Sequence, residues 1–164
     1  FAIGVSFGKD HYKDTDYAMT PHFGAAEAKE MTDSGLISIQ SHTYDMHQWP
    51  PYEDGSAAVR ENILPLAGES EEAYVQALTE DFTKSRAQLE DATGQPVDVL
   101  AYPAGQYSTL AQVTLQELGV HVTLSTNPGV NTVVKGLPQT LYAMLRFGII
   151  DDITPAALLA LIGA

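Results

Sequence analysis

Short runs of apolar residues along the chain alternate with longer stretches of helical periodicity. Each apolar run is five to seven residues long and predicts a buried strand. The expected strands are residues 1–7, 36–40, 97–102 and 120–124, with a further one toward the end of 140–150. The expected helices are residues 23–34, 70–93, 110–118 and a last one from 155. Strands that alternate with helices indicate an α/β fold with a mostly parallel sheet.

Residues that favour helix ends support these boundaries. Gly35 follows the first expected helix as a C-terminal cap, and Ser70 precedes the long helix as an N-cap. Thr154 followed by Pro155 is a typical start for the last helix. The apolar positions of the long helix recur at spacings of three, four and seven, at Val75, Leu78, Phe82 and Leu89.

The chain length suits a single domain, residues 1–164. Phe1 begins inside an expected strand with no polar lead-in, cap or turn, so we expect that an upstream segment is missing. Residues 48–69 contain two adjacent prolines and several turn residues, and they are long for a connection, which favours a functional loop.

Composition narrows the class of partner. The formal net charge of -13 repels nucleic acid and anionic lipid surfaces and favours neutral or cationic partners, although the same charge also serves solubility. The chain has no cysteine, which excludes thiolate metal sites and a cysteine nucleophile. No apolar stretch approaches the roughly 20 residues that a membrane-spanning helix needs.

Two of the five histidines lie in the stretch SHTYDMH, residues 41–47, directly after an expected strand. In a helix the rings of His42 and His47 would lie about 140° apart, and in an extended chain about 16 Å apart. Only a compact turn, which Asp45 would favour, brings both rings to about 2 Å from one metal ion. The spacing alone leaves open both solvated loop histidines and a metal site, which would need carboxylates to complete it.

A second stretch, AYPAGQY at residues 101–107, also follows an expected strand. Pro103 fixes its own φ and Gly105 permits unusual backbone angles, so the N–H of Ala104 can be held pointing into a cleft. A fixed, outward N–H is what an oxyanion hole requires. An ordinary Pro/Gly turn is the simpler interpretation of the local sequence. Both stretches lie at strand ends, where parallel α/β folds usually place their binding and catalytic residues.

Together the two stretches resemble the motifs of the polysaccharide deacetylases of carbohydrate esterase family 4, the NodB homology domain. The family's Ser-His-Thr motif with a second His matches Ser41-His42-Thr43 with His47, and its Tyr/Phe-Pro-Tyr-Gly turn is similar to Tyr102-Pro103-Ala104-Gly105. Residues 68–105 and 119–131 are similar to the subgroup that de-N-acetylates poly-N-acetylglucosamine in biofilm matrices. The resemblance implies an incomplete or distorted (β/α) barrel that lacks its first strand.

By this resemblance His42 and His47 would be two metal ligands, and the N–H of Ala104 would stabilise the oxyanion. The metal would be divalent, with Zn²⁺ expected first and Co²⁺ or Ni²⁺ as alternatives. The substrate would be an N-acetylglucosamine polymer of a biofilm or cell wall, which places the protein in the extracellular space or the cell envelope. Residues expected to contact the sugar are Tyr44, Trp49, Tyr102, Pro103 and Tyr107.

The chain departs from the family pattern at the catalytic carboxylates. The family's Asp-Asp pair supplies the third metal ligand and the general base, and it ends a strand upstream of the first one expected here. Asp14 and Asp16 follow the wrong strand and are expected to be solvated. Ala101 stands where the family usually has an Arg, and Ala104 where it has a Tyr, although only the main-chain N–H of Ala104 is needed. His121 lies in an expected strand and is interpreted as structural.

Two other interpretations remain open. A catalytically inactive relative would keep the carbohydrate-binding groove and truly lack the Asp pair. An unrelated metal-binding or structural α/β domain would carry the histidine pair by coincidence. In the favoured interpretation, residues 1–164 are a single deacetylase domain, an amide hydrolase, without its N-terminal part.

Overall fold

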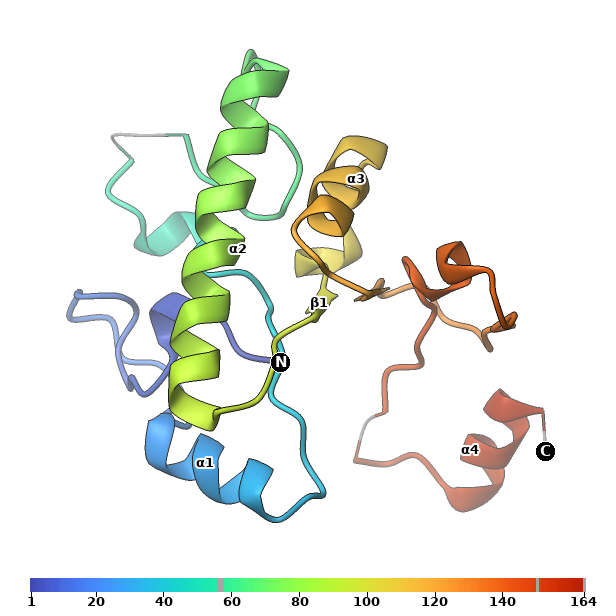
Figure 1. Cartoon of the computed structure of the whole chain (residues 1–164). Coiled ribbons are helices and arrows are strands. Elements are labelled where there is room, and N and C mark those ends of the chain that lie inside the picture. The colour runs from blue at the N-terminus through green and yellow to red at the C-terminus, as the bar shows by residue number, and fades with distance from the viewer. Residues whose placement is uncertain (56–57, 150, 164) are drawn as a thin grey trace.

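The computed structural model describes residues 1–55, 58–149 and 151–163 (Figure 1). The helices among these residues are α1 (Ala25–Asp33), α2 (Glu71–Thr93), α3 (Thr109–Glu117) and α4 (Pro155–Ile162). The strands are β1 (Val99–Ala101) and β2 (Val122–Leu124). Short 3₁₀ turns lie at Gly4–Ser6, Pro50–Tyr52, Pro103–Gly105 and Pro138–Leu141.

The sheet is a parallel array centred on β1 and β2. Val99 lies opposite Val122, and Ala101 lies opposite Leu124. Single parallel bridges carry the pairing further on both sides of this ladder. The bridges join Ala2 to Ser41, Ser41 to Leu100, and Leu124 to Met144. Five chain segments therefore lie side by side in their order along the sequence, which confirms the α/β fold with parallel pairing. Closure of this array into a barrel stays a prediction.

The expected strand at residues 1–7 is wrong beyond its first residues. Ala2 makes a strand bridge, but Gly4–Ser6 forms a 3₁₀ turn. The chain bends here because it packs closely against the turn that carries the histidines. A Cβ on Gly4 would overlap the ring of Tyr44, so only glycine allows this approach.

The expected strand at 36–40 is also wrong, because its first three residues are exposed and strand pairing begins only at Ser41. The side chain of Gln40 takes over part of the pairing. Its Oε1 accepts the N–H groups of Asp98 and Val99 at 3.1 and 3.0 Å, in place of ladder hydrogen bonds.

The strand-like run expected near the end of 140–150 is reduced to the bridge at Met144, and residue 150 lies outside the described residues. Because Pro138–Leu141 forms a 3₁₀ turn, extended pairing cannot start before that turn ends. This segment therefore adds one bridge to the array rather than a strand.

The long helix α2 is the main support of the sheet. Its predicted ends are confirmed: the Ser70 side chain accepts the N–H of Ala73 at 3.2 Å, and Gly94 closes the helix with a φ of 67°. The helix packs against both α1 and α3. The largest core cluster joins α2 to the sheet and α3, with fully buried members Ile63, Tyr74, Leu78, Phe82, Leu100, Tyr102, Leu115 and Val120.

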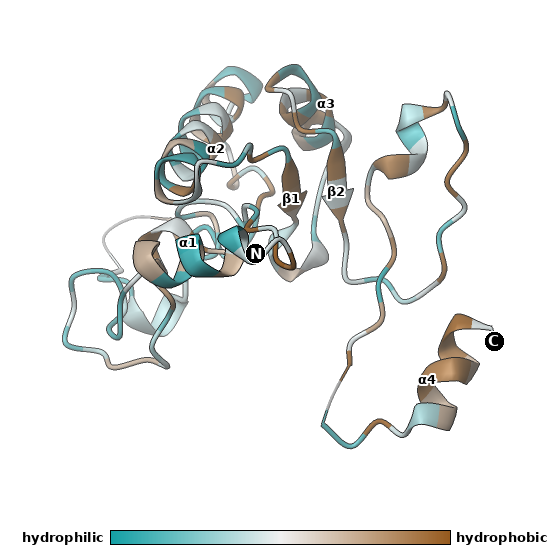
Figure 2. Ribbon diagram, turned by 60° about the horizontal axis from the view of Figure 1, so that its bottom comes forward, coloured by the Kyte–Doolittle hydropathy of each residue, from teal (hydrophilic) through white to brown (hydrophobic). Residues whose placement is uncertain are grey.

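The last helix, α4, begins as the sequence predicts. The Thr154 hydroxyl accepts the N–H of Ala157 at 3.1 Å, and Pro155 occupies the first helical position. The apolar side chains of α4 are largely exposed, and the helix lies apart from the body of the protein (Figure 2). Within the described residues, no helix combines the length and the apolar character that a bilayer crossing requires.

Replacing Phe82 with alanine tests the role of α2. Phe82 is fully buried in the core between α2 and the sheet, so the Phe82→Ala change should lower the free energy of unfolding by about 3–5 kcal/mol. Chemical denaturation followed by circular dichroism measures this loss. The neighbouring Thr83 is exposed, and Thr83→Ala should stay within about 0.5 kcal/mol of the wild type. Equal losses in the two variants would contradict the packing described.

Candidate metal centre and oxyanion site

The turn at residues 41–47 brings the two predicted histidines together. The ring centroids of His42 and His47 lie 5.1 Å apart, with the ring planes at 83°. Thr43, at the centre of the turn, is fully buried and adopts a left-handed φ of 72°. This is an uncommon conformation for a β-branched residue, and such strain clusters at functional sites. The structure thus has the compact turn that one shared ion requires.

Each histidine ring is oriented by a main-chain carbonyl. The Nδ1 of His42 lies 2.7 Å from the oxygen of Ala101, and the Nδ1 of His47 lies 3.1 Å from the oxygen of Glu61. Since a carbonyl oxygen only accepts, Nδ1 carries a proton in each ring. In the neutral form of such a ring Nε2 has a free lone pair, which is the usual arrangement of metal-binding histidines.

The segment that carries Glu61 is itself held against the turn. Gln48 and Arg60 exchange two hydrogen bonds, from the N–H of Gln48 to the carbonyl of Arg60 at 2.8 Å and from the N–H of Arg60 to Gln48 Oε1 at 2.7 Å. The Arg60 guanidinium forms a largely buried ion pair with Glu69. The carbonyl that faces His47 is therefore fixed by its neighbours.

The side chain of Asp81, on α2, stabilises the histidine turn through two hydrogen bonds. Its two carboxylate oxygens accept the N–H groups of Tyr44 and Asp45, at 2.8 and 2.7 Å. Burial raises the pKa of Asp81, while the two N–H groups act in the opposite direction. Sequence analysis did not identify this residue. The sequence signal that could have found it is its position: Asp81 is an acidic residue that immediately precedes Phe82, and Phe82 belongs to the apolar stripe of α2.

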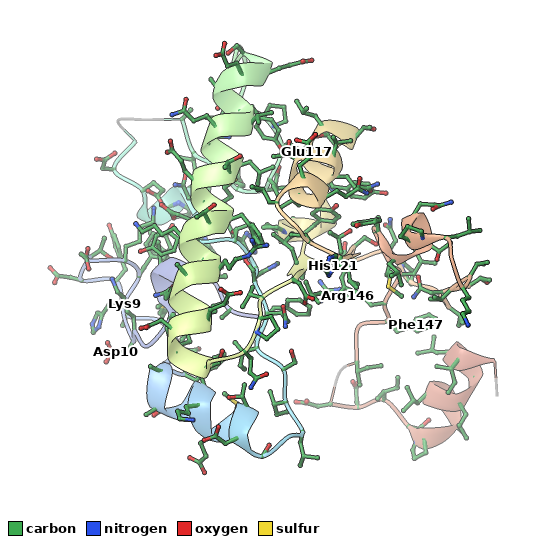
Figure 3. The ribbon with its side chains drawn as sticks, in the orientation of Figure 1. Lys9, Asp10, Glu117, His121, Arg146 and Phe147 are labelled. Atoms are coloured by element: carbon green, nitrogen blue, oxygen red, sulfur yellow. The ribbon has the colours of Figure 1, made fainter. Side chains whose placement is uncertain are left out.

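Burial lowers the pKa of His42 to about 4. The hydrogen bond to the Ala101 carbonyl opposes this shift, whereas the electrostatic interactions with His47 and with the Arg146 guanidinium add to it. Figure 3 shows Arg146 on the segment that follows Met144, well to the right of the loop that carries Lys9 and Asp10. Because its pKa is about 4, His42 is neutral at physiological pH, the state in which imidazole binds a metal.

The YPAG turn is sharply bent at Ala104, the predicted oxyanion donor. Ala104 adopts left-handed angles, with φ 52° and ψ 13°. Its N–H is bonded to none of the residues that the structure describes, and the residue is exposed. Gly105 packs so closely on Thr126 that an added Cβ would lie 2.8 Å from the Thr126 nitrogen. This contact fixes the turn and with it the direction of the Ala104 N–H.

One cleft of about 1110 Å³ contains both candidate groups. His47 and Ala104 contribute to its lining, as do Trp49 and Tyr52 from the long loop after the histidine turn. The other predicted sugar contacts lie elsewhere. Tyr44 packs beneath Lys84, with Nζ 4.0 Å from the ring centroid, and Tyr102 and Pro103 are buried. Tyr107 is partly exposed and stacks on Tyr102, with ring centroids 4.8 Å apart.

The described residues bring together two candidate ligands for a metal ion, His42 and His47. No group of three or more His, Cys, Asp or Glu residues suited to a metal occurs among them. Asp14 is fully solvated beside Lys9, and Asp16 is exposed, as expected. His121 lies just before β2 and is exposed, so the expected place within a strand is wrong. Two imidazoles that carbonyls orient in this way fit a divalent ion as two of its ligands.

The sequence model of the polysaccharide deacetylase family matches residues 1–123, three quarters of the chain. The chain therefore belongs to the polysaccharide deacetylase family, and the resemblance carried by the two motifs is confirmed. No curated protein matches the sequence.

Solved structures of deacetylases share the fold. A de-N-acetylase from Aggregatibacter actinomycetemcomitans superposes with a TM-score of 0.71 and 18% identity, covering 92% of this chain and 57% of its own. IcaB from Ammonifex degensii superposes with a TM-score of 0.68 and 22% identity, covering 100% of this chain and 60% of its own. The BpsB deacetylase domain from Bordetella bronchiseptica superposes with a TM-score of 0.57 and 23% identity, covering 80% of this chain and 50% of its own. The chain thus spans between 50% and 60% of the length of these three structures.

The imidazole of His42 should stay neutral until the pH falls to about 4. Because its pKa in the unfolded chain is about 6.5, acidification from about pH 6.5 to 4 should progressively remove the stability that neutral His42 contributes. NMR titration of the ring protons in the metal-free protein measures this midpoint, with the urea-unfolded chain as the control. A native midpoint near 6.5 would contradict the burial described for His42.

Proposed function

We propose that this protein is a metal-dependent deacetylase that removes acetyl groups from an N-acetylglucosamine polymer and releases acetate. One observation carries the proposal: main-chain carbonyls orient the paired rings of His42 and His47 through Nδ1, and His47 lines a cleft to which Ala104 also contributes. Family membership supports the reaction class. The de-N-acetylase from Aggregatibacter actinomycetemcomitans and the BpsB deacetylase domain share the fold, which supports removal of acetyl groups. The motif resemblance supports a poly-N-acetylglucosamine-type substrate.

His42 and His47 would hold the ion. A bound Zn²⁺, or Co²⁺ or Ni²⁺ in its place, polarises an acetyl carbonyl and lowers the pKa of coordinated water toward about 7. The two rings cannot rotate freely, because each donates Nδ1–H to a carbonyl. The third ligand and the general base, an Asp pair by family resemblance, have no counterpart in the part of the chain that the structure describes.

The Ala104 N–H would donate to the oxygen of the scissile amide. As water adds to the carbonyl carbon, negative charge develops on this oxygen, and a fixed N–H stabilises it without having to reorganise. The acetate then leaves, and the sugar amine takes up a proton. A protein with a net charge of -13 does not repel the cationic glucosamine that results.

The cleft would bind the polymer through its apolar lining. Trp49 would stack on a pyranose ring, since flat aromatic faces cover the apolar faces of sugars. Tyr44 and Tyr107 do not line the cleft. The buried Tyr102 and Pro103 would shape the turn that carries Ala104. A polymer of a biofilm or cell wall places the protein in the extracellular space or the cell envelope.

Zinc titration tests the metal site directly. Wild-type protein should bind Zn²⁺ in isothermal titration calorimetry, and His42→Ala and His47→Ala should each weaken binding at least about tenfold. His121→Ala is the matched control, because His121 is exposed and lies outside the pair. Equal affinity in all four proteins would sink the metal-site proposal, and circular dichroism shows that each variant is folded.

Acetate release tests the reaction. With divalent metal supplied, a protein that includes the expected upstream segment should release acetate from N-acetylglucosamine oligomers, and His47→Ala should reduce the rate at least about a hundredfold. His121→Ala should keep the wild-type rate. Absence of release with metal bound would favour the inactive carbohydrate-binding relative. Release that survives a chelator would contradict metal dependence.

A further inference from the structure

A pair of buried serine hydroxyls joins α2 to the histidine turn. The Oγ atoms of Ser85, on α2, and of Ser41, at the start of the turn, lie 2.8 Å apart, and both residues are fully buried. Ser85 stands on the buried face of the helix between Phe82 and Leu89. Alanine would favour the helix more strongly at this position and would bury no polar group. The packing of α2 therefore does not account for Ser85.

Ser41 passes the contact on to the main chain beside His42. Its Oγ accepts the N–H of Thr43 at 3.1 Å. Thr43 is fully buried and holds the left-handed φ of 72°, so this N–H lies away from water and depends on the serine as its acceptor. The two hydroxyls therefore hold the residue that directly follows His42 in a conformation that β-branched residues rarely adopt.

The next N–H groups of the turn are held in the same way. Thr43, Tyr44 and Asp45 supply three successive main-chain N–H groups, and each is accepted by a side chain. For Tyr44 and Asp45 the acceptor is Asp81, which lies one helical turn before Ser85 and on the same face of α2. Two polar residues of one helix thus hold all three groups, Asp81 directly and Ser85 through a second serine.

The carbonyl side of the turn is also tied to α2. Gly4 and Val5 donate their N–H groups to two carbonyls of the turn, at 3.0 and 2.9 Å. Gln88, on α2, donates its Nε2 to the carbonyl of Gly4 at 3.3 Å. Gln88 lies three residues after Ser85 and thus on the helix face that also carries Asp81. The turn is therefore fixed on both sides of its main chain by contacts that lead back to one helix.

We propose that Ser85 is a positioning residue of the candidate metal centre, which acts through Ser41 to set the direction of the His42 ring and the affinity for the ion. The inference rests on the metal site of the proposed function. Different elements hold the ring and the main chain of His42: the Ala101 carbonyl contacts Nδ1 at 2.7 Å, and the serine pair holds the following residue. A shift of the main chain at residue 43 therefore turns the ring against a fixed carbonyl. Both imidazoles then no longer meet one ion at about 2 Å.

Metal affinity and stability together separate this role from ordinary packing. Ser85→Ala should weaken Zn²⁺ binding at least about fivefold in isothermal titration calorimetry. Thr93→Ala is the matched control, because it removes another buried hydroxyl of α2, one that bonds to the carbonyl of Leu89. Both variants should lose similar stability in urea denaturation, but Thr93→Ala should keep the wild-type affinity. Wild-type zinc affinity in Ser85→Ala would refute the positioning role.

A double variant tests the route through Ser41. The protein that carries both Ser41→Ala and Ser85→Ala should lose no more zinc affinity than Ser41→Ala alone, because the second change removes a contact that is already lost. Additive losses would contradict the route.

Amide hydrogen exchange in the metal-free protein gives a readout that needs no ion. In Ser85→Ala the N–H of Thr43 should exchange at least about tenfold faster than in the wild type, while the N–H groups at the centre of α2 keep their rates. Unchanged exchange at Thr43 would overturn the proposal. Faster exchange in a protein whose wild type binds no zinc would refute the metal site of the proposed function, while confirming that Ser85 holds the turn.

Discussion

The carboxylate of Asp81 is the contact on which the candidate site depends most. By accepting the N–H groups of Tyr44 and Asp45, it fixes a turn in which Thr43 holds an unfavourable left-handed conformation. Without a buried acceptor these two donors would be left unsatisfied, at a cost of about 1–3 kcal/mol each. The helix thus supplies the free energy that keeps both imidazoles on one side of the turn. The site is a product of the packing of α2 as much as of its own seven residues.

The pairing of neighbouring sheet segments also positions the candidate site. Ser41 pairs with Ala2 on one side and Leu100 on the other, so the histidine turn and the YPAG turn leave the array side by side. The carbonyl of Ala101, at the end of β1, orients His42, and the next turn along that segment presents the Ala104 N–H. A sheet with little ladder pairing therefore still places both candidate groups at one edge, because each turn directly follows a strand pairing.

Sequence reasoning succeeded where the deciding interactions are local. Ser70, Gly94 and Thr154 mark helix ends through contacts within a few residues, and the motifs at 41–47 and 101–107 are continuous. It failed for the strands at 1–7 and 36–40, where Gly4 and the Gln40 side chain replace a ladder through contacts with distant segments. Asp81 was missed for the same reason, since it lies 36 residues from Asp45 in the sequence. No local sequence pattern indicates which main-chain N–H groups a buried carboxylate on a helix will accept from a distant segment.

The carbonyl of Glu61 that orients His47 has a thermodynamic consequence. Gln48 and the Arg60–Glu69 ion pair keep the segment around this carbonyl in place. Ordering of that segment and orientation of the His47 ring are therefore thermodynamically coupled. An ion bound at the proposed site would favour the ordered segment as well as the oriented ring, and its affinity would include the free energy of ordering. Residues that never touch the ion would then adjust how tightly the proposed site holds it.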